Sequence, residues 1–213
     1  FEDYFSKISN EFKLKKINVY LIKNTTANAF VFEDNIYFTT GLLDVINDED
    51  TLKAIYLHEY GHIIKNHFEA KKINIQQSMY KNAFFQMFSM GLAVFTNNAN
   101  IAIGTSITLN SNLMNKISKH SVNLEIEADN YMIEQIKKNK INTSELISFL
   151  NRPVDQNVNY FMSHPRNDER INNLRELNFK KTMNSKIFNW IKSKYSKSSD
   201  NQSFNIFFKL SVR

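Results

Sequence analysis

The sequence predicts a mostly helical α+β domain in which a small β-sheet or hairpin packs on a central helix. Of the 213 residues, 42% are apolar and 18 are Phe, which is enough side chain to fill one core. Alternation typical of strands is clearest near the N-terminus, whereas longer stretches repeat at the spacing of a helix. These observations exclude the disordered, collagen-like and disulfide-framework classes.

All but one of the predicted strands lie within the first forty residues. Residues 17–22 alternate weakly between apolar and polar side chains and predict one strand. Residues 29–40 predict a β-hairpin, because two stretches rich in aromatic and β-branched residues flank Asp34 and Asn35, a pair that tolerates the positive φ of a tight turn.

The predicted helices follow the hairpin. Residues from about 49 to 73 begin with carboxylates that suit a helix N-terminus and then repeat apolar residues at helical spacing, and residues 118–138 show the same spacing. We expect further helices from Thr143 to just before Arg152, over 168–178 and around Trp190, and a last strand over 204–210. Residues 1–178 would form one catalytic domain, on which a C-terminal extension over 179–213 packs.

Residues 82–115 contain no charged side chain, although Lys81 and Lys116 stand at the two ends. Neither of the two apolar stretches in this segment reaches the roughly 20 residues that span a bilayer as a helix, so we expect no simple transmembrane helix. One hypothesis is a pair of buried core helices. The other is a lid that covers the substrate or lies on a membrane surface.

Composition limits the chemistry. The chain has no Cys, which excludes Cys-ligated zinc, thiol nucleophiles and redox pairs and leaves His, Asp and Glu as the strong metal ligands. The net charge of +6 comes from 27 Lys and Arg against 21 Asp and Glu, in a sequence where Lys is frequent throughout. The Lys-rich C-terminal stretch contains no recognised reading motif, so we expect no nucleic-acid partner.

His58-Glu59-Tyr60-Gly61-His62 matches the pattern H-E-x-x-H and lies inside a predicted helix. On a helix, His58 and His62 present their rings from one face to a single metal ion, and Glu59 is directed at the water that the metal activates. The motif predicts one Zn²⁺ per chain, held by both histidines, with Glu59 as the catalytic base.

A catalytic zinc site usually has a third protein ligand and a position open for water. The metzincin extension of the motif is excluded, because it requires Gly and His where Lys65 and Phe68 stand. His67 would lie about 140° further round the helix than His62, which favours a surface or core histidine over a ligand.

The better candidate lies in Glu125-Ile126-Glu127-Ala128-Asp129. A helix places Glu125 and Asp129 on one face, with the small Ala128 allowing close approach to the first helix and Glu127 pointing elsewhere. We predict Glu125 as the third metal ligand and Asp129 as the acceptor of a hydrogen bond from a metal-bound His. The alternatives are a solvated acidic helix face and an exchange of roles between Glu125 and Glu127.

These pieces, in order, resemble the gluzincin metallopeptidases that include the HtpX heat-shock protease, the CAAX prenyl endopeptidases and the periplasmic BepA-type proteases. The resemblance covers roughly residues 17–178, and the chain is most similar to the soluble BepA-like branch, because it has no long apolar helix. The matching residues are Asn28-Ala29-Phe30, Thr40-Gly41-Leu42-Leu43, the motif over 58–62, the motif over 125–129, and Ser163-His164-Pro165 with Arg170-Ile171.

The resemblance implies a zincin-type metalloprotease domain and supports Glu125 as third ligand, with Asp129 behind it. It also implies that His164 lies close to the metal, either as a catalytic oxyanion partner or as a reversible fourth ligand that shuts the site; a helix cap is the alternative. For Arg170, a structural ion pair is favoured over an oxyanion role. By family analogy, we expect a periplasmic or cell-envelope protein whose upstream signal or anchor was removed.

The hairpin suggests how a protein or peptide substrate binds, since an extended peptide can add to an exposed strand edge through main-chain hydrogen bonds. Residues 28–33, beginning with Asn28, Ala29 and Phe30, or residues 36–40 would supply that edge. This arrangement favours an endopeptidase acting on unfolded or misassembled proteins. The alternative is a zinc-containing chaperone-like or assembly module that binds hydrophobic clients or a membrane surface, with little proteolysis.

Overall fold

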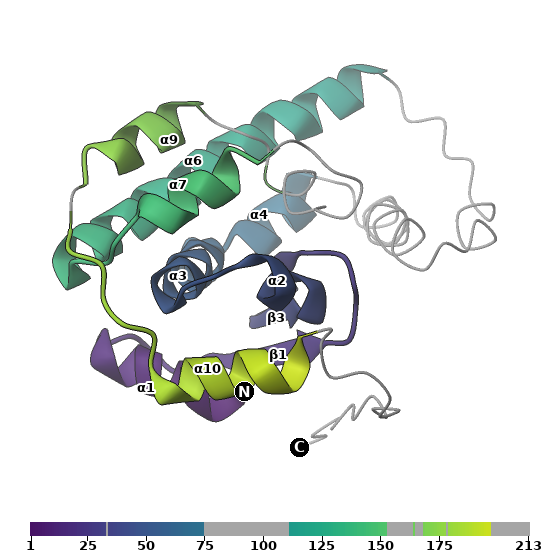
Figure 1. Cartoon of the computed structure of the whole chain (residues 1–213). Helices are drawn as coiled ribbons and strands as arrows, with labels where there is room; N and C mark the ends of the chain where they lie inside the picture. Colours follow the sequence, from purple (N-terminus) through teal and green to yellow (C-terminus); the bar gives the residue numbers. More distant parts are fainter. Residues whose placement is uncertain (33, 75–110, 153–163, 165–167, 178, 197–213) are drawn as a thin grey trace.

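The computed structural model describes residues 1–32, 34–74, 111–152, 164, 168–177 and 179–196 (Figure 1). For residues 71–74 and 111–121 it describes the backbone alone. The two hypotheses for residues 82–115 concern a segment outside the described residues, apart from the helical backbone of 111–115, and so does the predicted strand over 204–210.

The sheet has three strands, β1 (Asn18–Ile22), β2 (Ala29–Phe32) and β3 (Asn35–Thr39), in the order β1-β3-β2. β2 and β3 are antiparallel, with Ala29 opposite Phe38, which confirms the predicted hairpin. β1 runs parallel to β3. With helices covering most of the remaining described residues, the predicted mostly helical α+β fold is confirmed.

Helix α3 (Glu49–Ile64) occupies the centre, between the sheet on one side and α6 (Ser111–Asn139) on the other (Figure 1). The remaining helices surround these layers. They are α1 (Glu2–Glu11), α2 (Thr40–Val45), α4 (His67–Asn74), α7 (Ser144–Leu150), α9 (Asp168–Arg175) and α10 (Lys186–Tyr195).

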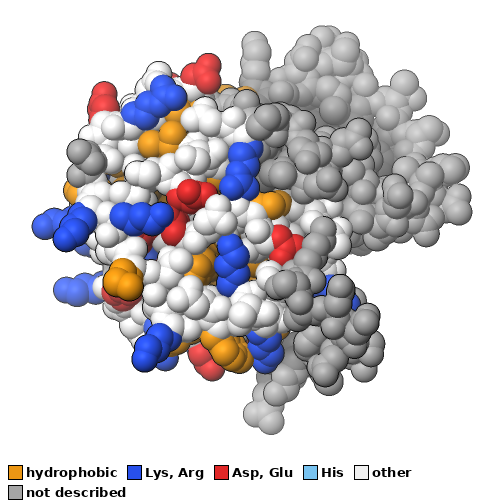
Figure 2. Space-filling model, viewed as in Figure 1, with side chains coloured by type: hydrophobic (Ala, Val, Ile, Leu, Met, Phe, Trp, Pro, Cys, Tyr) orange, Lys and Arg blue, Asp and Glu red, His pale blue; other side chains and the backbone are white. Residues whose placement is uncertain are grey.

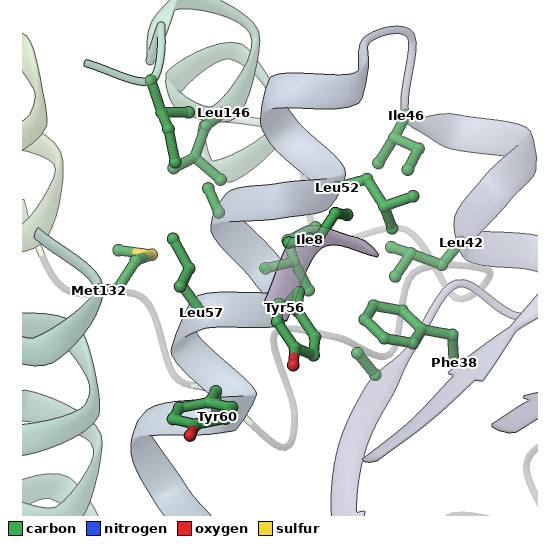
Figure 3. Close-up of a cluster of buried hydrophobic side chains, with 14 of the residues drawn as sticks. Ile8, Phe38, Leu42, Ile46, Leu52, Tyr56, Leu57, Tyr60, Met132 and Leu146 are labelled. Atoms are coloured by element: carbon green, nitrogen blue, oxygen red, sulfur yellow. The ribbon is translucent and has the colours of Figure 1, made fainter. Parts of the chain in front are cut away.

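Thirteen of the sixteen residues of α3 are buried, as expected of a helix packed on several sides. Asp48 starts the helix by accepting a hydrogen bond from the Thr51 amide at 2.8 Å. Figure 3 shows Tyr56 on the side of α3 that faces the sheet residue Phe38, whereas Leu57 points toward Met132 of α6. Because both sides are packed, the polar side chains of α3 are held in fixed positions.

Gly61 sets the distance between α3 and α6. A Cβ atom at this position would lie 3.1 Å from the Ala128 carbonyl oxygen and 3.2 Å from Ala128 Cα. Gly61 therefore lies close against the backbone of Ala128, the approach that we expected at this small residue, and the contact brings the acidic motif of α6 against the histidines of α3.

The sequence predicted a helix over residues 49–73, but the structure interrupts it. α3 ends at Ile64, and Asn66 adopts a left-handed conformation with φ of 53° before α4 begins at His67. Asn tolerates this region better than most residues. The interruption changes the direction of the chain, so the side chain of His67 does not lie where a continuous helix would place it.

The segment that carries α10 contacts the start of α3. Glu49 accepts hydrogen bonds from the Ser185 amide at 2.6 Å and from the Ser185 hydroxyl at 3.1 Å. Phe188 and Ile191 of α10 are buried in the same core as α3. These contacts fix the end of α3 opposite to its histidines.

Among the described helices, none combines the length and the apolar character needed to cross a membrane. On the face shown in Figure 2, Lys and Arg side chains are scattered and lie among Asp and Glu. Within the described residues of that face, the positive charge forms no continuous surface.

Candidate metal centre

Four buried side chains from three parts of the chain converge on one point. His58 and His62 come from α3, Glu125 from α6 and His164 from the chain before α9, and one ligand atom of each lies within 4.8 Å of all the others. His58 Nε2 is 3.2 Å from Glu125 Oε2, and His62 Nε2 is 3.4 Å from Glu125 Oε1. The structure thus brings together the three predicted ligands and adds His164.

Glu125, and not Glu127, faces His58 and His62. Burial alone would raise the pKa of Glu125, but the nearby rings of His164, His58 and His62 hold it well below its usual range. Glu125 is therefore ionised at neutral pH, which is the form that binds a metal ion. Glu127 points away, with 54% of its side chain exposed.

Asp129 lies behind His58, one helical turn beyond Glu125. His58 Nδ1 is 2.9 Å from Asp129 Oδ1, and the Nε–H of Arg170 donates to Asp129 Oδ2 at 2.5 Å. Arg170 is thus in the ion pair that its sequence context favoured. Burial opposes protonation of His58, but its hydrogen bonds with Asp129 and Glu125 raise its pKa to about 9, so the arrangement favours positive charge at this point.

Glu59 is completely buried on α3, next to His58 in sequence. Its Oε1 lies 3.3 Å from His164 Nε2. The carboxylate therefore reaches the same small region as the four converging donors, from the helix that supplies two of them.

His164 contacts the other site residues through both ring nitrogens. Its Nδ1 is 2.7 Å from Glu125 Oε2 and 3.1 Å from His58 Nε2, whereas its Nε2 is 3.3 Å from the Ala29 carbonyl oxygen. The ring thus lies between the converging donors and strand β2. A histidine that only caps a helix would not need these contacts, so they favour a role for His164 at the metal-binding group over a helix cap.

Of the predicted substrate-binding residues, Ala29 and Phe30 lie on β2 and Asn28 lies just before it. Within the described residues, β2 pairs with β3 alone. Asn28 faces β3, since its carbonyl accepts a hydrogen bond from the Thr39 amide at 3.0 Å. Phe30 pairs with Tyr37 of β3, so the outward main-chain groups of this stretch belong to Ala29 and the residue after Phe30. The proposal of residues 36–40 as the edge was wrong, because β3 lies between the two other strands.

His67 was expected to be a surface or core histidine and not a ligand, and it is indeed buried and outside the converging group. Its Nδ1 lies 2.8 Å from His62 Nδ1, and its Nε2 lies 3.3 Å from Glu127 Oε2. This contact was not predicted, because a helix that continued past Lys65 would have placed His67 elsewhere. A signal was present in Asn66, a residue type that often ends a helix.

The hydrogen bonds around the site fit a bound cation. In neutral His58, the form that binds a metal ion, an Nδ1–H that donates to Asp129 leaves a lone pair on Nε2, which faces a Glu125 oxygen at 3.2 Å. Two acceptors at this distance repel each other unless a proton or a cation lies between them. The same buried region holds the carboxylates of Glu59, Glu125 and Asp129 beside the guanidinium of Arg170, an excess of negative charge that suits a divalent ion.

A helix carrying H-E-x-x-H, a second helix supplying a glutamate and an adjoining small sheet define a metallopeptidase of the gluzincin type. Residues 4–178 match Peptidase family M48, and the chain belongs to this family of HtpX- and BepA-like metallopeptidases. The match covers the family as a whole, so assignment to the soluble BepA-like branch stays a prediction. A search of curated proteins found no match to the chain.

Proposed function

We propose that this protein is a zinc-dependent endopeptidase that hydrolyses peptide bonds of unfolded or misassembled proteins. One observation carries the proposal: His58, His62, Glu125 and His164 form a buried group that could hold a metal ion, with Glu59 beside it. Membership of Peptidase family M48 supports hydrolysis of peptide bonds. Imidazole and carboxylate ligands are the set that zinc takes in catalytic sites without Cys.

In this proposal, His58, His62 and Glu125 hold the zinc ion, which when bound supplies Lewis-acid polarisation of the scissile carbonyl and of a water molecule. Glu59 accepts a proton from that water and later delivers it to the leaving amine. Asp129 orients His58, and Arg170 in turn holds Asp129.

Strand β2 is the proposed docking edge for the substrate main chain. The outward carbonyl of Ala29 lies beside the metal-binding group, since His164 contacts both. A peptide added along β2 would therefore pass directly over the site. Main-chain pairing asks for an extended segment and no particular sequence, which favours unfolded polypeptides as substrates.

Zinc content and activity test the proposal together. We expect about one zinc ion per purified chain and cleavage of casein, an unfolded substrate, but slow cleavage of a folded protein of similar length. Removal of zinc with a chelator should abolish cleavage, and added zinc should restore it, because the ion polarises both reactants. Circular dichroism before and after chelation controls for unfolding. Cleavage of casein by protein shown to contain no metal would contradict the proposal.

We also propose that His164 is a reversible fourth ligand that closes the site. Its Nδ1 reaches the converging donors, and its Nε2 lies beside the Ala29 carbonyl and Glu59. The ring thus takes up the space next to the catalytic base and contacts the main-chain acceptor that a docked peptide would use. A substrate would have to displace it.

Replacing His164 with Ala separates the two roles that the sequence left open. If His164 closes the site, we expect casein cleavage to rise several-fold while zinc binds less tightly. If it instead stabilises an oxyanion, its loss should lower kcat by roughly 10²–10³-fold. Steady-state kinetics and a zinc-competition assay decide between the roles, with Arg175→Ala, an exposed change on the neighbouring helix α9, as the matched control.

A further inference from the structure

His62 has a partner on the side of its ring that faces away from the metal-binding group. His62 Nδ1 lies 2.8 Å from His67 Nδ1, and His67 Nε2 lies 3.3 Å from Glu127 Oε2. The rings of His62 and His67 meet edge to face, at an interplanar angle of 75°. A line of contacts thus runs from the site through two imidazoles to a carboxylate at the surface.

The proton positions along this line follow from the geometry. His62 Nε2 faces His58 and Glu125, so a neutral His62 that binds a metal there must carry its proton on Nδ1. That Nδ1–H then donates to His67 Nδ1, which must be the unprotonated nitrogen of its ring. The proton of His67 is consequently on Nε2, from which it points at Glu127.

We propose that His67 is a positioning residue that holds His62 in its metal-binding tautomer and orientation, and that Glu127 fixes the tautomer of His67 in turn. This inference rests on the proposed function, because it requires His62 to be a metal ligand. The inference gives a role to Glu127, which is not one of the proposed ligands. It also gives one to His67, which a continuous helix would have placed elsewhere.

Because the contact between His62 and His67 is buried, His67 and not water is the acceptor for the His62 proton. His62 is 4% exposed and His67 is 2% exposed, so solvent does not reach the bond between them freely. A buried N–H donor without an acceptor costs free energy, because its lost hydrogen bond to water is not replaced. Without His67, His62 gains by moving its proton to Nε2, the nitrogen that faces the metal-binding group, and this tautomer cannot bind the ion.

The break between α3 and α4 makes the contact. Asn66, with φ of 53°, changes the direction of the backbone at the end of α3, and its carbonyl accepts the first hydrogen bond of α4 from Ala70 at 3.0 Å. His67 is the first residue of α4 and so returns toward His62 across this short connection.

Zinc affinity of two variants of similar size tests the role of His67. In His67→Asn, the amide oxygen can replace Nδ1 as the acceptor, whereas His67→Leu offers none. We expect His67→Leu to weaken zinc binding by about 10–100-fold, the usual effect of losing a hydrogen-bond partner of a ligand. His67→Asn should stay within a few-fold of the unaltered protein. Competition with a fluorescent chelator measures both, and thermal melts check folding.

A spectroscopic readout separates orientation of His62 from general stability. After zinc is removed, ¹⁵N chemical shifts of His62 should show a larger share of the Nδ1–H tautomer in the unaltered protein and in His67→Asn than in His67→Leu. The inference is overturned if Leu and Asn weaken zinc binding equally, or if Leu has no effect on zinc binding. If the unaltered protein itself binds no zinc, the proposed function fails instead.

Variants of Glu127 provide a second test, which does not depend on whether the His67 variants fold. Glu127→Ala should weaken zinc binding less than His67→Leu, because water can reach a side chain that is 54% exposed and replace its oxygen. Glu127→Gln retains an acceptor and should bind zinc as the unaltered protein does. The matched control is Glu134→Ala, an exposed carboxylate farther along α6. An equal change in Glu134→Ala and Glu127→Ala would contradict the proposed part of Glu127.

Discussion

Replacing Glu59 with Gln is expected to remove peptide cleavage while leaving zinc binding intact. Gln has nearly the shape of Glu but accepts no proton at neutral pH, so the variant loses the base and little else. General base catalysis contributes typically about 10²–10⁴-fold, and we expect kcat on casein to fall by that factor. Glu59 is fully buried and lies 3.3 Å from His164 Nε2, so no solvent-borne base easily takes its place.

Three measurements on the Glu59→Gln protein make this result specific. Zinc content should stay near one ion per chain, and the melting temperature should change little, since the amide fits the same space. Glu134→Gln, the same chemical change on an exposed face, should cleave casein normally. A Glu59→Gln protein that binds zinc and cleaves casein at more than about a tenth of the normal rate would rule out Glu59 as the base.

Local sequence patterns were sufficient for the elements that bear the motifs. The hairpin turn at Asp34 and the helical spacing around His58 were both visible in the sequence, and both elements are present. Two helices were missed. α1 buries Tyr4, Phe5 and Ile8 at helical spacing, a pattern diluted by its charged residues, whereas the six residues of α2 are too few for any periodicity to stand out.

Long-range placement was predictable only in part. The spacing of Glu125 and Asp129 put both carboxylates on one face of a helix, and the structure turns that face toward α3. The parallel pairing of β1 with β3 has no local signal, because it depends on how the intervening chain crosses over. The sequence alone therefore could not show that β2 is the edge strand and that β3 is the central one.

The partners of the two histidines differ in how far they could be predicted. Asp129 shares a helix with Glu125, so a single assumption about periodicity places it behind His58. His67 contacts His62 only because the chain leaves the helix at Lys65 and takes a left-handed turn at Asn66. Such a break interrupts the regular spacing on which predictions from sequence rely, so the contact between His67 and His62 was not predicted.

Replacing Glu125 with Ala is expected to abolish tight zinc binding and, with it, casein cleavage. Glu125 is the member of the group that carries the negative charge, and its two oxygens contact His58, His62 and His164. The loss should exceed the roughly 10–100-fold that removal of a ligand's hydrogen-bond partner costs, because a metal ligand itself is removed. Metal analysis after dialysis, with zinc competition for the residual affinity, measures the effect.

The zinc content of Glu125→Ala should be compared with that of Glu127→Ala, because the comparison shows which of the two carboxylates is the ligand. Glu127 lies two residues away on the same helix, but its carboxylate is half exposed and contacts His67. If Glu125 is the ligand, Glu125→Ala loses stoichiometric zinc and Glu127→Ala keeps it with reduced affinity. The opposite result would make Glu127 the ligand. Residues two apart on a helix lie about 200° apart in one direction, which is about 160° in the other. To bring Glu127 to the site, α6 would therefore have to turn by about 160° and lose the contact between Ala128 and Gly61. That close contact is the physical reason to expect zinc loss from Glu125→Ala alone.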